Sequence, residues 1–75
     1  MNKIDKIIQE LRELVPVKVV PCTDKRFPVS LDYKLYGADL SHILTCLGMF
    51  VDNSKEPYVI YGIYEDFVGI GIVNH

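Results

Sequence analysis

The run from Tyr58 to Val73 constrains the fold more than any other part of this sequence. It reads YVIYGIYEDFVGIGIV, and it combines three glycines and four aromatic residues with aliphatic ones. Glu65 and Asp66 interrupt the run, so neither apolar half approaches the roughly 20 residues that span a bilayer. Two β-rich segments separated by two residues are typical of a β-hairpin. The run therefore predicts a hairpin with Glu65 and Asp66 at its tip.

A two-residue tip also predicts the register of this hairpin. The expected pairs are Tyr64 with Phe67, Gly62 with Gly69, Ile60 with Gly71, and Tyr58 with Val73. Cross-strand partners share a face, so all three glycines fall on one side of the hairpin. Glu-Asp is unfavourable for a type I′ turn, so a longer loop or a bulge with a different register stays an alternative.

The two faces of the hairpin differ. One is a glycine trough formed by Gly62, Gly69 and Gly71 and rimmed by Tyr58, Tyr64 and Phe67. The other is continuous and apolar, with Val59, Tyr61, Ile63, Val68, Ile70 and Ile72. Glycine in a strand usually marks close backbone approach, so we expect a helix in the trough. The alternatives are an open groove for a peptide, a side chain of a partner or a small apolar ligand, and backbone strain.

Two other segments have the apolar period of a helix. The first carries Ile4, Ile7, Ile8, Leu11 and Leu14, with Asn2 as a cap, Asp5 near its start and Pro16 at its end. The second carries Leu40, Ile43, Leu44 and Leu47, with Asp39 as the N-cap and Gly48 just beyond its end.

Three further segments are expected to be strands. Val17–Val20 is stopped by Pro21 and suits a sheet edge, and the loop 21–28 follows. Val29–Tyr36 alternates, with Val29, Leu31, Tyr33 and Leu35 on one face and Ser30, Asp32, Lys34 and Tyr36 on the other. Met49–Val51 is expected to be a short strand before the turn-forming segment 52–57.

The predicted order is therefore α-β-β-α-β-β-β in a single domain over residues 1–75. No crossover helix separates the paired strands, so we expect an α+β fold with a mostly antiparallel sheet of four to five strands. Two helices cover this sheet. The continuous face of the last hairpin is expected to pack beneath the first helix, which is predicted to be the longer one.

Composition indicates surplus apolar surface. Hydrophobic residues make up 49% of only 75 residues, and a chain of this size buries only about 60% of the surface that it exposes when unfolded. Self-association is one way to cover the remainder. The net charge of −2 argues against a general nucleic-acid binder, which normally has a basic face.

Four residues carry side chains that can bind a metal ion: Cys22, His42, Cys46 and His75. His42 and Cys46 are four residues apart on the second helix, so both could reach one metal ion. No pair has the two-residue spacing of a zinc knuckle, and we expect no metal and no cofactor. The two cysteines and the charged N-terminal segment suit reduced thiols in a cytoplasmic protein.

No catalytic group is predicted. Ser41 and His42 are adjacent on a helix and diverge, so they do not form a nucleophile–base pair, and Asp39 is explained as a cap. We therefore expect that the chain is not an enzyme. Lys25, Arg26 and Phe27 could grip a single-stranded nucleic acid, extended by Lys18 and Lys34, but a solvated loop with Phe27 in the core is favoured.

The sequence thus favours a small cytoplasmic protein-interaction module that self-associates. We expect Tyr36, Tyr58, Tyr64 and Phe67 to contact the partner, because aromatic residues suit interfaces. Size and the lack of a catalytic motif would fit an accessory or inhibitor protein of a phage or mobile element. The alternatives are a ligand-sensing domain that uses the glycine trough and a weak binder of single-stranded nucleic acid.

Overall fold

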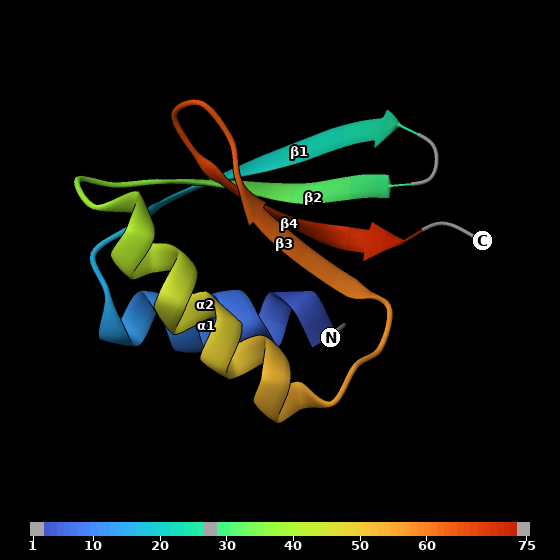
Figure 1. Cartoon of the computed structure of the whole chain (residues 1–75), viewed down its shortest axis with the longest axis horizontal. Helices are drawn as coiled ribbons and strands as arrows, with labels where there is room; N and C mark the ends of the chain where they lie inside the picture. The colour runs from blue at the N-terminus through green and yellow to red at the C-terminus, as the bar shows by residue number, and fades with distance from the viewer. Residues whose placement is uncertain (1–2, 27–28, 74–75) are drawn as a thin grey trace.

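The computed structural model describes residues 3–26 and 29–73, and it contains two helices and a four-stranded antiparallel sheet. The elements are α1 (Lys3–Leu14), β1 (Lys18–Arg26), β2 (Val29–Tyr36), α2 (Leu40–Ser54), β3 (Val59–Ile63) and β4 (Val68–Val73). The strand order is β1-β2-β4-β3, so β1 and β3 are the edge strands (Figure 1). The predicted α+β class is confirmed. The sheet has four strands, one fewer than the predicted order of elements contains.

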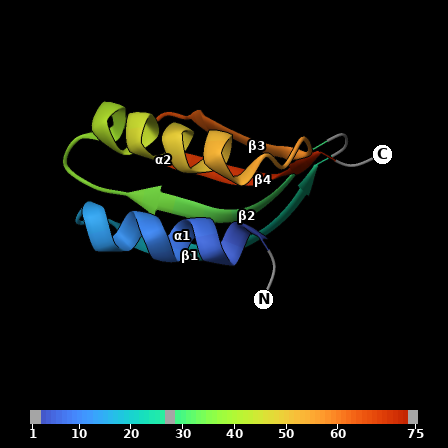
Figure 2. The same ribbon diagram turned by 90° about the horizontal axis from the view of Figure 1, so that it is seen from below.

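Both helices lie on the same face of the sheet. Figure 2 shows α1 alongside β1 and β2, and α2 alongside β3 and β4. The expectation that one helix fills the glycine trough is therefore wrong, because the trough belongs to the opposite face. The continuous face of the last hairpin does pack beneath a helix, as predicted. That helix is α2, which has 15 residues against 12 in α1.

Helix α1 buries the predicted stripe except at its end. Ile4, Ile7, Ile8 and Leu11 are buried, whereas Leu14 is 59% exposed. Val15 takes its place in the core, because its N–H continues the helical pattern by donating to the carbonyl of Leu11 at 2.9 Å. The predicted cap, Asn2, lies outside the described residues.

Helix α2 starts where predicted and ends later. The Asp39 carboxylate accepts a hydrogen bond from the His42 N–H at 3.1 Å, which confirms the N-cap. Gly48 does not end the helix, and the strand expected over Met49–Val51 is wrong. The helix continues to Ser54 because Val51 extends the buried stripe, and Lys55 ends it in the left-handed conformation with φ 54°.

Strands β1 and β2 also differ from expectation. Pro21 does not end β1, which continues to Arg26 and occupies much of the segment expected to be a loop. A proline is tolerated there because β1 is an edge strand. The register of β2 shifts between Leu31 and Tyr33, so its alternation breaks at Asp32. Leu31 pairs with Gly71 and Tyr33 with Ile70, so these two β2 side chains lie on opposite faces.

The last hairpin has the predicted register. Gly62 pairs with Gly69 and Ile60 with Gly71, and the Tyr64 N–H donates to the Phe67 carbonyl at 2.8 Å. The turn is not type I′, because among the described residues Lys55 is the only non-glycine residue with positive φ.

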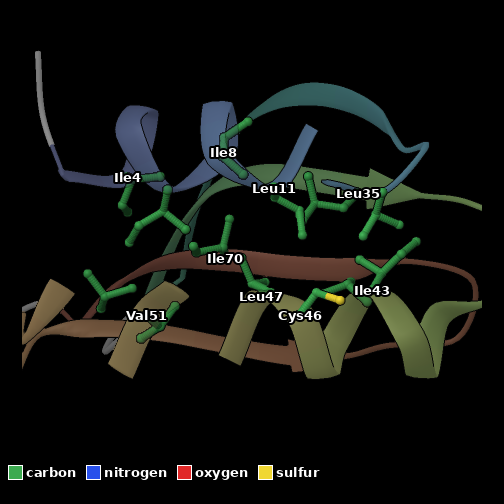
Figure 3. Packing of buried hydrophobic residues seen from close by; sticks show 13 residues of the cluster. Ile4, Ile8, Leu11, Leu35, Ile43, Cys46, Leu47, Val51 and Ile70 are labelled. Atoms are coloured by element: carbon green, nitrogen blue, oxygen red, sulfur yellow. The ribbon is translucent and has the colours of Figure 1, made fainter. Parts of the chain in front are cut away.

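The core lies between the helix layer and the sheet. Figure 3 shows Ile4, Ile8 and Leu11 of α1 facing the side chains of α2, with Ile70 between the two helices. The buried cluster comprises Ile4, Ile7, Ile8, Leu11, Val15, Leu35, Ile43, Cys46, Leu47, Val51, Val59, Val68 and Ile70. None of the helices in the described ranges is both long and apolar enough to cross a membrane.

Candidate interaction surface

The second face of the sheet, which we call the helix-free face, carries most of the residues singled out from the sequence. Because partners across a ladder share a face, it holds Lys34 and Tyr36 of β2, Phe67 before β4, and Tyr58 and Tyr64 beside β3. All four predicted partner-binding residues thus fall on one surface.

Three of these rings form what we call the aromatic cluster: Tyr36, Tyr64 and Phe67. Tyr64 and Phe67 stack with their centroids 5.0 Å apart and their planes at 16°. The Tyr36 and Phe67 centroids are 5.8 Å apart with the planes tilted by 46°. The Lys34 ammonium lies 4.9 Å from the Phe67 centroid, within the range of a cation–π contact. Phe67 is thus held from several sides, and Tyr64 is exposed above it.

The glycine trough is partly filled by its own neighbours. A Cβ atom at Gly69 would lie 2.9 Å from a ring carbon of Tyr64 and 3.3 Å from a methyl carbon of Leu31. Leu31 is buried but does not belong to the main core cluster, because the shift at Asp32 turns it to the helix-free face. Gly71, which pairs with Leu31, is also buried. By contrast, nothing lies within 4 Å of a Cβ placed at Gly62.

Sequence reasoning missed Leu31 as part of this surface. The alternation of β2 predicts that Leu31 shares a face with Tyr33 and Leu35. No residue in β2 signals the register shift between Leu31 and Tyr33. The signal that could have revealed it is the pair of glycines in β4, Gly69 and Gly71, which pair with β2, since glycines leave space for a large side chain from the adjacent strand.

Tyr61 lies on the other face, against α2. Its hydroxyl oxygen would be 2.9 Å from a Cβ at Gly48, so the absence of a side chain at Gly48 lets the ring cover the helix. Tyr61 is still 38% exposed and Ile63 46% exposed, because β3 is the outermost strand.

A separate groove lies between α1 and the first hairpin, with a volume of about 650 Å³. Its lining is mixed in charge and includes Asp5, Arg12, Glu13 and Tyr33. The Tyr33 hydroxyl donates a hydrogen bond to Asp5, which joins β2 to α1. This hydrogen bond is the main reason that the pKa of Tyr33 is raised above its usual value, and burial adds to it.

Three of the candidate metal ligands, Cys22, His42 and Cys46, lie within the described residues and form no metal site there. His42 Nε2 lies 3.8 Å from Cys46 Sγ, so the expected contact along α2 is present. Cys46 is nevertheless a core residue. Within the described ranges no group of three or more His, Cys, Asp or Glu residues could hold a metal ion. His75 lies outside those ranges.

The candidate nucleic-acid residues are distributed differently from expectation. Lys25 and Arg26 belong to β1 and not to a loop, and Phe27 lies outside the described residues. The strands of Lys18 and Lys34 are adjacent, as that hypothesis requires: Lys18 pairs with Tyr36, so both lysines share the face of the aromatic cluster.

Comparison of the chain with models of known families, with curated proteins and with solved structures found no match.

Proposed function

We propose that this chain is a non-catalytic protein-interaction module whose contact surface is the helix-free face, centred on the aromatic cluster. One observation carries the proposal. The helices bury the apolar residues of the opposite face, while Tyr36, Tyr64 and Phe67 form a supported cluster on a face that no described helix covers.

The chemistry of this surface suits a protein partner. Tyrosine offers a large apolar area with a polar tip and is enriched among residues that dominate binding energy. Tyr36 belongs to β2, and Tyr64 and Phe67 flank the turn between β3 and β4. The rings are held by contacts with Lys34 and with one another, so little side-chain freedom is lost on binding. Binding is favoured over catalysis because the cluster consists of aromatic rings, which supply contact area.

The other two candidate functions have less support. A nucleic acid would meet Lys18 and Lys34, but also Glu65 and Asp66 at the tip beside the cluster, and these carboxylates repel phosphates. A small ligand in the glycine trough would have to displace Tyr64 and Leu31 above Gly69. We retain a cytoplasmic location as part of the proposal, because Cys22 and Cys46 are free thiols, which fits a reducing compartment.

In-cell photocrosslinking tests the proposal directly. A photoreactive phenylalanine analogue replaces Tyr64 on the helix-free face, or Met49 on α2, which is 51% exposed. We expect a crosslinked protein from position 64 that is absent from position 49 and is lost when Phe67→Ser removes the ring beneath Tyr64. Identical products from both positions, or products that survive Phe67→Ser, would contradict the proposal.

A further inference from the structure

The two edges of the sheet are very different in character. Strand β1 carries Lys18, Pro21 and Lys25 among its residues, and its register shifts between Pro21 and Asp24. Charges, prolines and bulges are the features that keep an edge strand from pairing with another chain. Strand β3 reads VIYGI, with neither a charge nor a proline, and its ladder with β4 is regular. Only one edge is therefore protected.

The backbone of β3 has free groups at this edge. Tyr58 and Tyr64 bond to β4 through main-chain groups: the Tyr58 carbonyl accepts from Val73 and the Tyr64 N–H donates to Phe67. Hydrogen bonding to an antiparallel partner alternates along a strand. Every second residue between Tyr58 and Tyr64, starting with the residue after Tyr58, therefore directs its N–H and C=O groups away from β4. These residues are Val59, Tyr61 and Ile63. The Val59 N–H is used locally by the Glu56 carbonyl at 3.4 Å.

Apolar side chains flank the same edge. Of the large hydrophobic side chains that are exposed, four belong to this strand and its ends: Tyr58, Tyr61, Ile63 and Tyr64. An uncharged edge with apolar side chains on both faces is a strong template for strand pairing.

We propose that β3 pairs antiparallel with β3 of a second copy of this chain, with Tyr61 opposite Tyr61 of that copy. The arrangement has two-fold symmetry, so each chain contributes the same groups. Tyr61 exchanges two backbone hydrogen bonds with its counterpart. The Ile63 N–H of each chain donates to the Val59 carbonyl of the other, which adds two more and leaves the local bond of Val59 intact.

A second copy fits this register because its side chains are complementary to the first. On the helix side, Val59 lies opposite Ile63 of the other copy, so branched aliphatic side chains meet. On the helix-free side, Ile60 lies opposite Gly62 of the other copy. Gly62 is the position where a Cβ would meet nothing within 4 Å, so the Ile60 side chain has space there. A pairing with its two-fold axis at any other residue would not place Ile60 opposite Gly62.

The helix layer also accommodates the second copy. Each helix covers two strands (Figure 2), and two strand spacings amount to about 9.6 Å, which is close to the distance between packed helices. The α2 helices of the two copies would therefore lie side by side at the same spacing as α1 and α2 within one chain. Gly48 lies beside Tyr61 on the side of α2 next to this contact, where the absent side chain admits the Tyr61 hydroxyl of the same chain.

This dimer would join the two helix-free faces into one eight-stranded surface, and it goes beyond the proposed function, which holds for a monomer as well. The strand is only five residues long, so the interface is expected to bury less than about 1,200 Å² in total, typical of weak complexes. We therefore expect a dimer that forms at micromolar concentration and dissociates on dilution.

Sedimentation velocity and native mass spectrometry test the existence of the dimer. We expect a species of twice the chain mass of 8.6 kDa that falls to one copy on dilution. Tyr61→Lys places two like charges across the symmetry axis, so it is expected to weaken association at least tenfold. The matched control is Leu14→Lys, which changes an exposed residue of α1 far from β3 and is expected to leave the dimer unchanged.

Disulfide trapping tests the register. Opposed residues of a hydrogen-bonded antiparallel pair have Cα atoms about 5.5 Å apart, within the reach of a disulfide. Tyr61→Cys is therefore expected to crosslink two chains under mild oxidation. The control is Ile63→Cys, at a residue that is more exposed than Tyr61. Its counterpart lies four residues away, about 13 Å along the strands, so it is expected not to crosslink beyond the background of the unsubstituted chain.

Three results would overturn the proposal. The first is an unsubstituted chain that stays monomeric at 100 micromolar or above, on the order of ten times the expected dissociation constant for an interface of this class. The second is a dimer that survives Tyr61→Lys with its affinity unchanged. The third is crosslinking at residue 63 and not at residue 61. The photocrosslinking experiment at position 64 does not depend on the dimer, so the proposed function can still be tested if the dimer does not form.

Discussion

Leu31 packs over Gly69 on the helix-free face, with a methyl carbon 3.3 Å from the position that a Cβ at residue 69 would occupy. This contact exists because the register of β2 shifts at Asp32 and turns Leu31 away from the core. The glycine that was expected to admit a helix instead admits a leucine from the neighbouring strand. The contact also supports Tyr64, whose ring carbon lies 2.9 Å from the same position.

Substitution of the two paired glycines is expected to have opposite effects. Gly69→Val forces Leu31 and Tyr64 to move and is expected to lower the free energy of unfolding by about 1–3 kcal/mol. Gly62→Ala meets nothing within 4 Å and is expected to raise it by about 0.5 kcal/mol, because glycine is unfavourable in a strand. Urea unfolding of both variants at low protein concentration measures the difference. Equal losses at the two positions would contradict this account of the trough.

Tyr36→Ala is expected to weaken partner binding without unfolding the chain. Tyr36 lies outside the buried cluster, and truncation of an aromatic residue at the centre of an interface commonly costs more than about 1.4 kcal/mol, or tenfold in affinity. The measurement is the yield of the Tyr64 photocrosslink, with Leu14→Ala as the control on α1. An unchanged yield, or a loss of cooperative unfolding, would count against the role assigned to Tyr36.

Tyr33→Phe is expected to lower the free energy of unfolding by about 1.5 kcal/mol at neutral pH, because it removes a hydrogen bond to a carboxylate. The pKa of Tyr33 is raised above 10.0, chiefly by this hydrogen bond. The stabilisation is therefore complete below pH 10 and is lost as the pH rises through the higher pKa of the folded state. Urea unfolding of both proteins at pH 7 and above pH 10 tests this. A difference that does not shrink in alkali would show that the loss comes from packing.

Asp32→Asn is expected to stabilise the chain at neutral pH. Burial, with a smaller contribution from the nearby Asp5 carboxylate, raises the pKa of Asp32 above 3.8. A raised carboxyl pKa means that folding favours the protonated form, so the favourable contribution is present below pH 3.8 and is lost as the pH rises through the folded-state pKa. The amide removes that loss. The stability difference from the unsubstituted chain should therefore be largest near pH 7 and vanish near pH 3, and the reverse trend would refute the assignment.

Features that depend on neighbouring residues were predictable from the sequence alone. The register of the last hairpin follows from its two-residue tip and from pairing along a single ladder. The Asp39 cap and the buried stripe at Ile4, Ile7, Ile8 and Leu11 follow from spacing within one element. The aromatic residues that share the helix-free face could also be predicted, because side chains alternate between the two faces along a strand and cross-strand partners share a face.

Features that depend on contacts between distant residues were decided only by the tertiary structure. Gly48, Phe50 and Val51 have weak helical preference, yet they are helical because Val51 finds space in the core and Tyr61 covers Gly48. Leu31 faces the glycines because β2 must satisfy two different ladders at once. The choice of one face for both helices depends on how the two hairpins join through β2 and β4. Burial against partners that are distant in sequence outweighs local preference, so these features cannot be derived from any single stretch of this sequence.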